Sequence, residues 1–179
     1  MFLSDCSGVA RESLMAAPFK IGRIAQVAFV VRDLELRMQA FWDDFGIGPW
    51  SIYAFEPPRV KDMTYRGQRQ DFRMRVAFAM CGDTQIELVQ SIAGPNLYEE
   101  FLAECGEGVQ HLGVHVLDMD SATSQMQALG YELVQSGRGY GVRGDGAFAY
   151  FATADRLSTL IELIQLPQER YPPDASYPA

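Results

Sequence analysis

The chain contains one short pattern twice, as Gln85-Ile86-Glu87-Leu88-Val89-Gln90 and as Leu160-Ile161-Glu162-Leu163-Ile164-Gln165. Both stretches are rich in aliphatic and β-branched residues, which predicts two β-strands. Side chains alternate between the faces of a strand, so in each copy the glutamate faces away from the isoleucine and leucine that flank it. Burying a carboxylate is costly unless it is paired or binds a metal. The repeat therefore marks Glu87 and Glu162 as equivalent candidate functional residues.

A second pattern also occurs twice, upstream of each of these strands. Gln26 and His111 each open an apolar stretch, and each is followed seven residues later by an aspartate, Asp33 or Asp118. Internal self-similarity of this kind indicates a duplicated supersecondary unit. We therefore expect Gln26 and His111 to occupy equivalent places in two related modules.

Each aspartate precedes a run of apolar residues at helical spacing. Aspartate near the start of a helix and glycine just past its end are typical boundaries, and Gly46 and Gly130 close the two runs. The apolar positions are Leu34, Met38, Phe41, Trp42 and Phe45 in the first run, and Met119, Ala122, Met126 and Leu129 in the second.

The sequence after each helix is rich in β-forming residues, so each copy is predicted to have the order β-α-β-β-β and the fold to be α+β. The last hairpin turn is expected at 154–158. A short linker helix is expected near 96–104. The predicted divisions are an N-terminal tail at 1–20, a first module with the linker helix at 21–105, a second module at 106–167 and a C-terminal tail at 168–179.

Composition and charge exclude several classes of protein. Apolar residues make up 48% of the chain and the net charge is −8, which predicts a folded domain that does not bind nucleic acid or anionic membranes. The first ten residues lack the features of a signal peptide, and no apolar run approaches the length of a membrane span. Three cysteines without metal-like spacing favour a reducing, cytoplasmic location.

A pseudo-twofold relation between the modules would bring four polar side chains together, namely Gln26, Glu87, His111 and Glu162. One amide, one imidazole and two carboxylates suit a divalent metal such as Zn, Ni, Co, Mn or Fe, with positions left for water or substrate oxygens. The alternative is a metal-free cleft lined by the same residues.

Candidate substrate-binding residues lie around this predicted centre. His115 should share a strand face with His111, and it either orients substrate or is a hydrogen-bonded interior histidine. The basic segment 59–75 includes Arg66 and Arg69, which could receive an anionic group, or could belong to a solvated loop. Aromatic residues that could line a pocket include Trp50, Tyr53 and Tyr150.

These residues together resemble the vicinal oxygen chelate superfamily, also called the glyoxalase/bleomycin-resistance/dioxygenase superfamily. The resemblance spans about residues 21–167 and is carried by four stretches: 26–34, the turn 45–50, the two Ile-Glu-Leu strands and 106–114. It implies a cupped, incomplete β-barrel built from two βαβββ modules. It also implies a small-molecule substrate and a homodimer. The Gln26, Glu87, His111 and Glu162 set is similar to the metal ligands of zinc-type glyoxalase I.

The local sequence is similar to the methylmalonyl-CoA epimerase branch, in which the first ligand is commonly histidine rather than glutamine. The shared chemistry of these branches is proton abstraction next to a carbonyl, which implies a metal-dependent lyase or isomerase acting on a small carbonyl or acyl-thioester substrate. Glu162 is the expected base and Glu87 its partner. The alternatives are a metal-free protein that sequesters a small molecule and, third, a ring-cleaving dioxygenase.

Overall fold

The computed structural model describes residues 19–178, so the predicted N-terminal tail at 1–20 lies almost wholly outside the described residues. Within that range the helices are α1 (Leu34–Phe45), α2 (Leu97–Glu104), α3 (Met119–Ala128) and α4 (Ala154–Leu157). The strands are β1 (Gln26–Val30), β2 (Trp50–Phe55), β3 (Lys61–Tyr65), β4 (Gln68–Arg69), β5 (Arg73–Cys81), β6 (Thr84–Ala93), β7 (Gly108–His115), β8 (Leu133–Tyr140), β9 (Gly146–Phe151), β10 (Leu160–Gln165) and β11 (Ala175–Tyr177). Among the described helices, none is long and apolar enough to cross a membrane.

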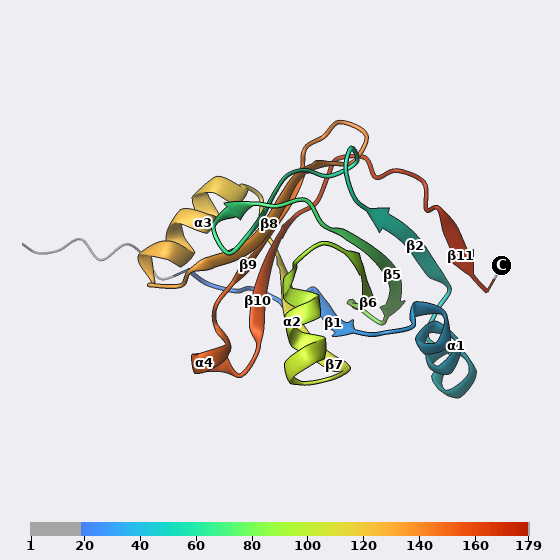
Figure 1. Ribbon diagram of the computed structural model, residues 1–179. Helices are drawn as coiled ribbons and strands as arrows, with labels where there is room; N and C mark the ends of the chain where they lie inside the picture. Colours follow the sequence, from blue (N-terminus) through green and yellow to red (C-terminus); the bar gives the residue numbers. More distant parts are fainter. Residues whose placement is uncertain (1–18, 179) are drawn as a thin grey trace, which may run out of the picture.

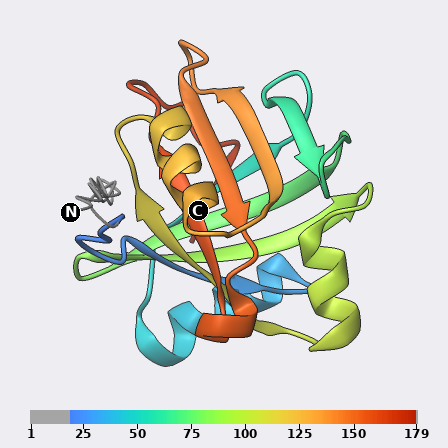
Figure 2. The same ribbon diagram turned by 90° about the vertical axis from the view of Figure 1, so that its left-hand side faces the viewer.

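All of these strands join one open, mixed sheet in the order β11-β2-β5-β6-β1-β7-β10-β9-β8-β3-β4. The first strands of the two modules, β1 and β7, pair antiparallel at its centre. Each also pairs in parallel with the last strand of its own module, β6 or β10. The sheet curls without closing, so the two halves form a cup (Figures 1 and 2). This is the predicted α+β fold.

Helix α1 begins and ends at the residues that the sequence indicated. The Asp33 side chain accepts a hydrogen bond from the backbone N–H of Leu36, and Gly46 ends the helix in the left-handed conformation at φ 64°. In the second module the Asp118 side chain caps α3 in the same way through the N–H groups of Asp120 and Ser121. Equivalent capping residues thus position equivalent helices on the two halves of the sheet.

Alternating strand residues divide the apolar side chains between the two faces of the sheet. On the outer face, Leu88 packs with Leu34 and Met38 under α1. Leu163 packs with Met126 in the corresponding cluster under α3. The inner cluster combines residues of both halves with Leu97, Tyr98 and Leu102 of α2, which therefore covers part of the inside of the cup. Burial of the aliphatic neighbours on the outer face turns the glutamates of β6 and β10 inward.

The two edges of the sheet depart from the simple repeat. The hairpin β3–β4 leaves the first module and pairs with β8 of the second. The chain end, predicted as a tail, contributes β11, which pairs antiparallel with β2 (Figure 1). The expected hairpin turn at 154–158 contains the single helical turn α4.

Candidate metal centre and cavity

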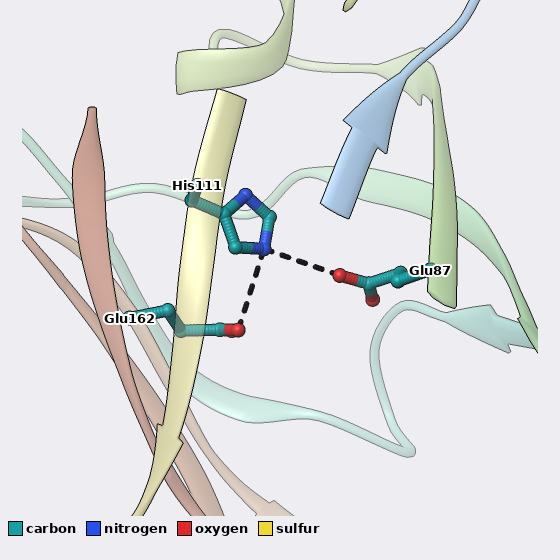
Figure 3. Close-up of side chains that lie close together, drawn as sticks. All are labelled: Glu87, His111 and Glu162. Atoms are coloured by element: carbon teal, nitrogen blue, oxygen red, sulfur yellow. Dashed lines mark hydrogen bonds and ion pairs between the residues drawn. The ribbon is translucent and has the colours of Figure 1, made fainter. Parts of the chain in front are cut away.

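Four buried polar side chains meet at the inner face of the sheet, and they are the four that the repeat singled out. Gln26, Glu87, His111 and Glu162 are each at most 6% exposed. Nε2 of His111 lies 3.1 Å from a carboxylate oxygen of Glu87 and 3.4 Å from one of Glu162 (Figure 3). Nε2 of Gln26 donates to the same two carboxylates at 2.5 and 3.4 Å. The structure therefore brings the predicted set together; its role as a ligand set stays a prediction.

The register of the four central strands explains this convergence. Ala28 of β1 lies opposite Glu87 on one side and His111 on the other. Gly113 of β7 lies between Gln26 and Glu162 in the same way. A Cβ atom at Gly113 would come within 2.8 Å of side-chain atoms of both Gln26 and Ile164. The missing side chain at Gly113 thus leaves the space in which Gln26 turns toward the glutamates.

The imidazole of His111 is held by a residue that the sequence analysis did not single out. Nδ1 of His111 lies 3.1 Å from Oε1 of the buried Gln110, whose Nε2 donates to the backbone carbonyl of Leu97 at 2.9 Å. Because that second bond fixes the amide, Oε1 is the atom that faces the ring and accepts the Nδ1 proton. Nε2 is then the nitrogen that faces the carboxylates: it donates to them when the ring is protonated and is free to bind a metal when the ring is neutral.

Burial and close charges shift the protonation of this cluster. Burial is the main cause that raises the pKa of Glu87 to about 7, with Glu162 acting in the same direction and His111 opposing it. Burial acts to lower the pKa of His111, but its hydrogen bonds to Glu162 and Glu87 outweigh this and raise the pKa to about 9. Two buried carboxylates thus require a compensating positive charge, supplied by a protonated His111 or by a cation.

The donor atoms fit a divalent metal ion. One ligand atom from each of Glu87, His111 and Glu162 lies within 4.8 Å of the others, which lets a single ion contact all three. The amide of Gln26 presents nitrogen to the carboxylates, and a half-turn about its last bond would present Oε1 instead. Imidazole and carboxylate ligands suit Zn, Ni, Co, Mn or Fe(II).

A pocket opens above these side chains, and its empty space, including solvent at the open mouth, amounts to about 760 Å³. Gln26, Glu87 and Glu162 form part of its floor. Its walls are mainly aromatic, from Tyr53, Phe55, Phe78, Tyr140, Phe148 and Tyr150. A mostly apolar pocket with a few converging polar groups is the usual form of a small-molecule site. Tyr53 and Tyr150 are thus where the sequence analysis placed them, while binding of a substrate by either remains a prediction.

Four other predicted substrate-binding residues, Trp50, His115, Arg66 and Arg69, lie outside the lining of this cavity. Trp50 and Tyr53 are an odd number of residues apart on β2, so they take opposite faces, and Trp50 is fully buried beneath α1. His115 is the last residue of β7 and is exposed, so it is neither interior nor at the cavity floor.

Arg66 and Arg69 face outward because acidic residues pair with them. Arg66 makes two hydrogen bonds of 2.7 Å to Glu100, and Arg69 lies 2.7 Å from Asp62. Both arginine side chains are more than half exposed and neither lines the cavity. These two residues fit the second interpretation of the basic segment 59–75, in which it belongs to a solvated loop.

Comparison with known proteins fits this geometry. A family model described as the Glyoxalase/Bleomycin resistance protein/Dioxygenase superfamily matches residues 25–151, which extend from β1 into β9. The chain belongs to this superfamily. The resemblance seen in the repeated strands is thereby confirmed, although membership alone does not fix a reaction. A comparison with curated proteins gave no match.

Solved structures with this superfamily fold include several epimerases. Methylmalonyl-CoA epimerase from Mycobacterium tuberculosis is 21% identical, with a TM-score of 0.61 over 87% of this chain and 95% of that one. A Streptomyces coelicolor methylmalonyl-CoA epimerase variant in complex with 2-nitronate-propionyl-CoA is 18% identical, with a TM-score of 0.61 over 82% and 98% of the two chains. A hypothetical protein from Bacillus halodurans is 14% identical, with a TM-score of 0.58 over 83% and 97%. At these identities the similarity establishes the shared fold.

Three residues at this site were not predicted from the sequence, for two different reasons. Gln110 was overlooked because strict alternation puts it on the opposite face from His111, whereas a bulge where β7 pairs with β1 lets both neighbours be buried. Arg170 and Tyr171 line the cavity but lie in the segment interpreted as a tail. The sequence around these two residues is rich in proline and has no strand-like or helix-like alternation of apolar residues. It therefore gave no indication that they lie at the cavity.

Proposed function

We propose that this protein is a metal-dependent lyase or isomerase that moves a proton at a carbon next to a carbonyl group. The observation that carries the proposal is the meeting of Glu87 and Glu162, from opposite halves of the cup, at the floor of an aromatic cavity, with the buried His111 close to both. Gln26, Glu87, His111 and Glu162 would hold one divalent ion. That ion, when bound, would supply Lewis-acid polarisation of a substrate carbonyl.

The side chains divide the remaining work between them. Glu162 is the proposed base that takes the proton from the carbon, and Glu87 is its partner, which returns a proton. Because β6 and β10 lie on opposite sides of the central pair β1–β7, the two carboxylates approach a bound molecule from different sides. Gln110 keeps the His111 ring fixed, and the aromatic walls exclude water from the reacting carbon.

The epimerases with a similar fold support a carbonyl or acyl-thioester substrate. One of those structures is described as holding methylmalonyl-CoA, a thioester. The chain departs from that branch at Gln26, where the resemblance implies histidine, so the proposal is limited to the proton-transfer class and leaves lyase and isomerase products both to be tested.

A second candidate is a binding protein that sequesters an aromatic or hydrophobic small molecule without turnover. The observation that favours it is the aromatic wall of the cavity, which would bind such a molecule even without a metal. The two proposals differ in whether Gln26, Glu87, His111 and Glu162 are needed.

Elemental analysis combined with turnover assays tests the proposed function. The protein is reconstituted separately with Zn, Ni, Co, Mn and Fe(II), desalted, and assayed with the glutathione adduct of methylglyoxal and with methylmalonyl-CoA. We expect about one ion per chain, loss of that ion in His111→Ala, and a fall of roughly 10²–10⁴-fold in turnover in Glu162→Gln.

Glu104→Gln serves as the matched control, because Glu104 is an exposed residue at the end of α2. That variant should keep both metal and activity. Full metal content and full turnover in Glu162→Gln would contradict the proposal. Failure of every ion to bind wild-type protein would favour the sequestration alternative.

A further inference from the structure

The segment 167–177, which we call the C-terminal strap, contributes Pro167, Arg170 and Tyr171 to the lining of the cavity and is fixed at both ends. At its first end the carbonyl of Glu169 accepts from the N–H of Val142 at 2.9 Å, and the N–H of Gln168 donates to Asp145 at 3.1 Å. At its second end β11 pairs with β2. The strap thus spans from the loop after β8 to the opposite edge of the sheet (Figure 1).

Asp174 fastens the second end and neutralises one cavity arginine. Its two carboxylate oxygens lie 2.7 and 2.8 Å from the same guanidinium nitrogen of Arg59, and one of them also accepts from the N–H of Ala54 at 2.8 Å. Arg59 lines the cavity, but its charge is already matched by Asp174. It is therefore poorly placed to receive an anionic ligand.

Arg170, which also lines the cavity, differs from Arg59 in this respect. Its guanidinium carbon lies 5.7 Å from the centroid of the Phe78 ring, and within residues 19–178 it makes no ion pair. Stacking on an aromatic ring holds the planar group without using its five N–H donors. The strap thus presents one oriented and unmatched positive charge to the cavity, beside Tyr171.

We infer that Arg170 receives a carboxylate of the substrate, and that the cavity takes small carbonyl compounds with a flat apolar body and one anionic end, which lies beside Phe78 and Tyr171. This deepens the proposed function and rests on it for the position of the carbonyl group. A planar guanidinium binds a carboxylate through two parallel hydrogen bonds. A single unmatched arginine suits a monoanion, and the surrounding aromatic rings suit the flat body.

Binding of two probes that differ only in charge tests the inference. Cinnamate and the neutral cinnamamide are titrated into full-length protein by isothermal titration calorimetry, with metal and after chelation by EDTA. We expect cinnamate to bind roughly tenfold or more tightly than cinnamamide in both states, since charged hydrogen bonds contribute about 1.5–3 kcal/mol. Arg170→Met should remove that preference while leaving cinnamamide binding within about twofold.

Arg23→Met is the matched control, since Arg23 is another exposed arginine that lies outside the cavity lining. It should keep the full preference for cinnamate, and Arg170→Lys should keep part of it. Equal binding of the two probes by wild-type protein, a preference that survives in Arg170→Met, or no binding of either probe would overturn the inference.

The comparison with and without metal separates this inference from the proposed function. A preference that disappears on chelation would mean that the metal, rather than Arg170, holds the carboxylate, and would also overturn the inference. A preference that depends on Arg170 in a protein without metal-dependent turnover would leave the inference standing and contradict the proposed function.

Discussion

The two halves of the cup agree at the centre of the sheet and differ at its edges. In both, the first strand pairs in parallel with the last, and the last strand turns a glutamate inward, Glu87 in one half and Glu162 in the other. At the edges, the first half is extended by β11 from the chain end, whereas the second is extended by β3–β4 from the first module. The repeated strands thus supply the candidate metal centre, while the segment after β10 adds Pro167, Arg170 and Tyr171 to the lining of the cavity.

This division suggests which changes each region tolerates. The four polar side chains at the centre contact one another across the two halves. A small displacement of one central strand therefore moves all four relative to each other. The edge segments are held by exposed ion pairs and short ladders, whose individual contributions are small. Substitutions at the centre should therefore affect stability and metal binding more than substitutions at the edges.

The sharpest test of the shared centre is Gly113→Ala. The repeat aligns Gly113 with Ala28, so one half already carries a methyl group where the other has none. At Gly113 the added Cβ would meet Gln26 and Ile164 at 2.8 Å, and overpacking of this kind costs about 1–3 kcal/mol. We expect the free energy of unfolding, measured in urea, to fall by that amount and metal affinity to weaken as Gln26 is displaced.

Gly108→Ala is the control for this prediction, since Gly108 lies on the same strand and an added Cβ would meet nothing within 4 Å. Its unfolding free energy should change by no more than about 0.5 kcal/mol. Equal effects of the two substitutions would show that Gly113 is not a special position at the contact between the halves.

A second test concerns the one polar residue of the centre that has its own orienting partner. Gln110→Leu removes the acceptor for Nδ1 of His111 while keeping a side chain of similar size. We expect zinc affinity, measured by competition with a chromogenic chelator, to weaken about 10- to 100-fold. Gln110→Glu keeps an acceptor and should lose much less. Equal losses in both variants would point to a packing role for Gln110 instead.

Much of the centre could be predicted because its signals are local or repeated. Asp33 and Gly46 marked the two ends of α1 before any tertiary contact was known. The inward direction of Glu87 and Glu162 followed from strand alternation, since apolar flanking residues have to pack on the outer face. Two independent copies of each signal reduced the ambiguity that a single lone glutamate or histidine would have left.

The edges of the sheet and the part of the cavity wall formed by the chain end could not be predicted, because they depend on contacts between segments distant in sequence. Arg66 looked available for a ligand until the fold placed Glu100 beside it. Arg170 looked like part of a solvated tail until β11 was paired with β2. Neither outcome leaves a trace in the local sequence. The partners are 34 residues apart in the first case, and in the second Asp174 of the strap and Ala54 of β2 are 120 residues apart.

The smallest expected effect tests how the strap is held at the first half's edge. Burial acts to raise the pKa of Asp174, but hydrogen bonds from the N–H of Ala54 and from Arg59 outweigh this and lower the pKa from its usual 3.8. A carboxyl group whose pKa is lowered by folding stabilises the folded state at any pH above its pKa in the unfolded chain, here 3.8. This stabilisation is lost as the pH falls from 3.8 through the lower pKa of the folded state. Since both partners are about a third or more exposed, solvent screening limits the contribution to about 0.5–1 kcal/mol.

We therefore expect Asp174→Asn to lower the free energy of unfolding, measured in urea, by about 0.5–1 kcal/mol between pH 5 and 8. This gap in unfolding free energy between variant and wild-type protein should close below about pH 3.8. Asp62→Asn breaks the corresponding ion pair at the other edge, with Arg69, and both of its partners are more than 60% exposed. Its effect should be smaller still and within about 0.5 kcal/mol. A gap for Asp174→Asn that persists unchanged at pH 3 would mean that Asp174 stabilises the strap through the shape and hydrogen bonding of its side chain and not through its charge, whereas no gap at any pH would leave the β11 ladder as what holds the strap.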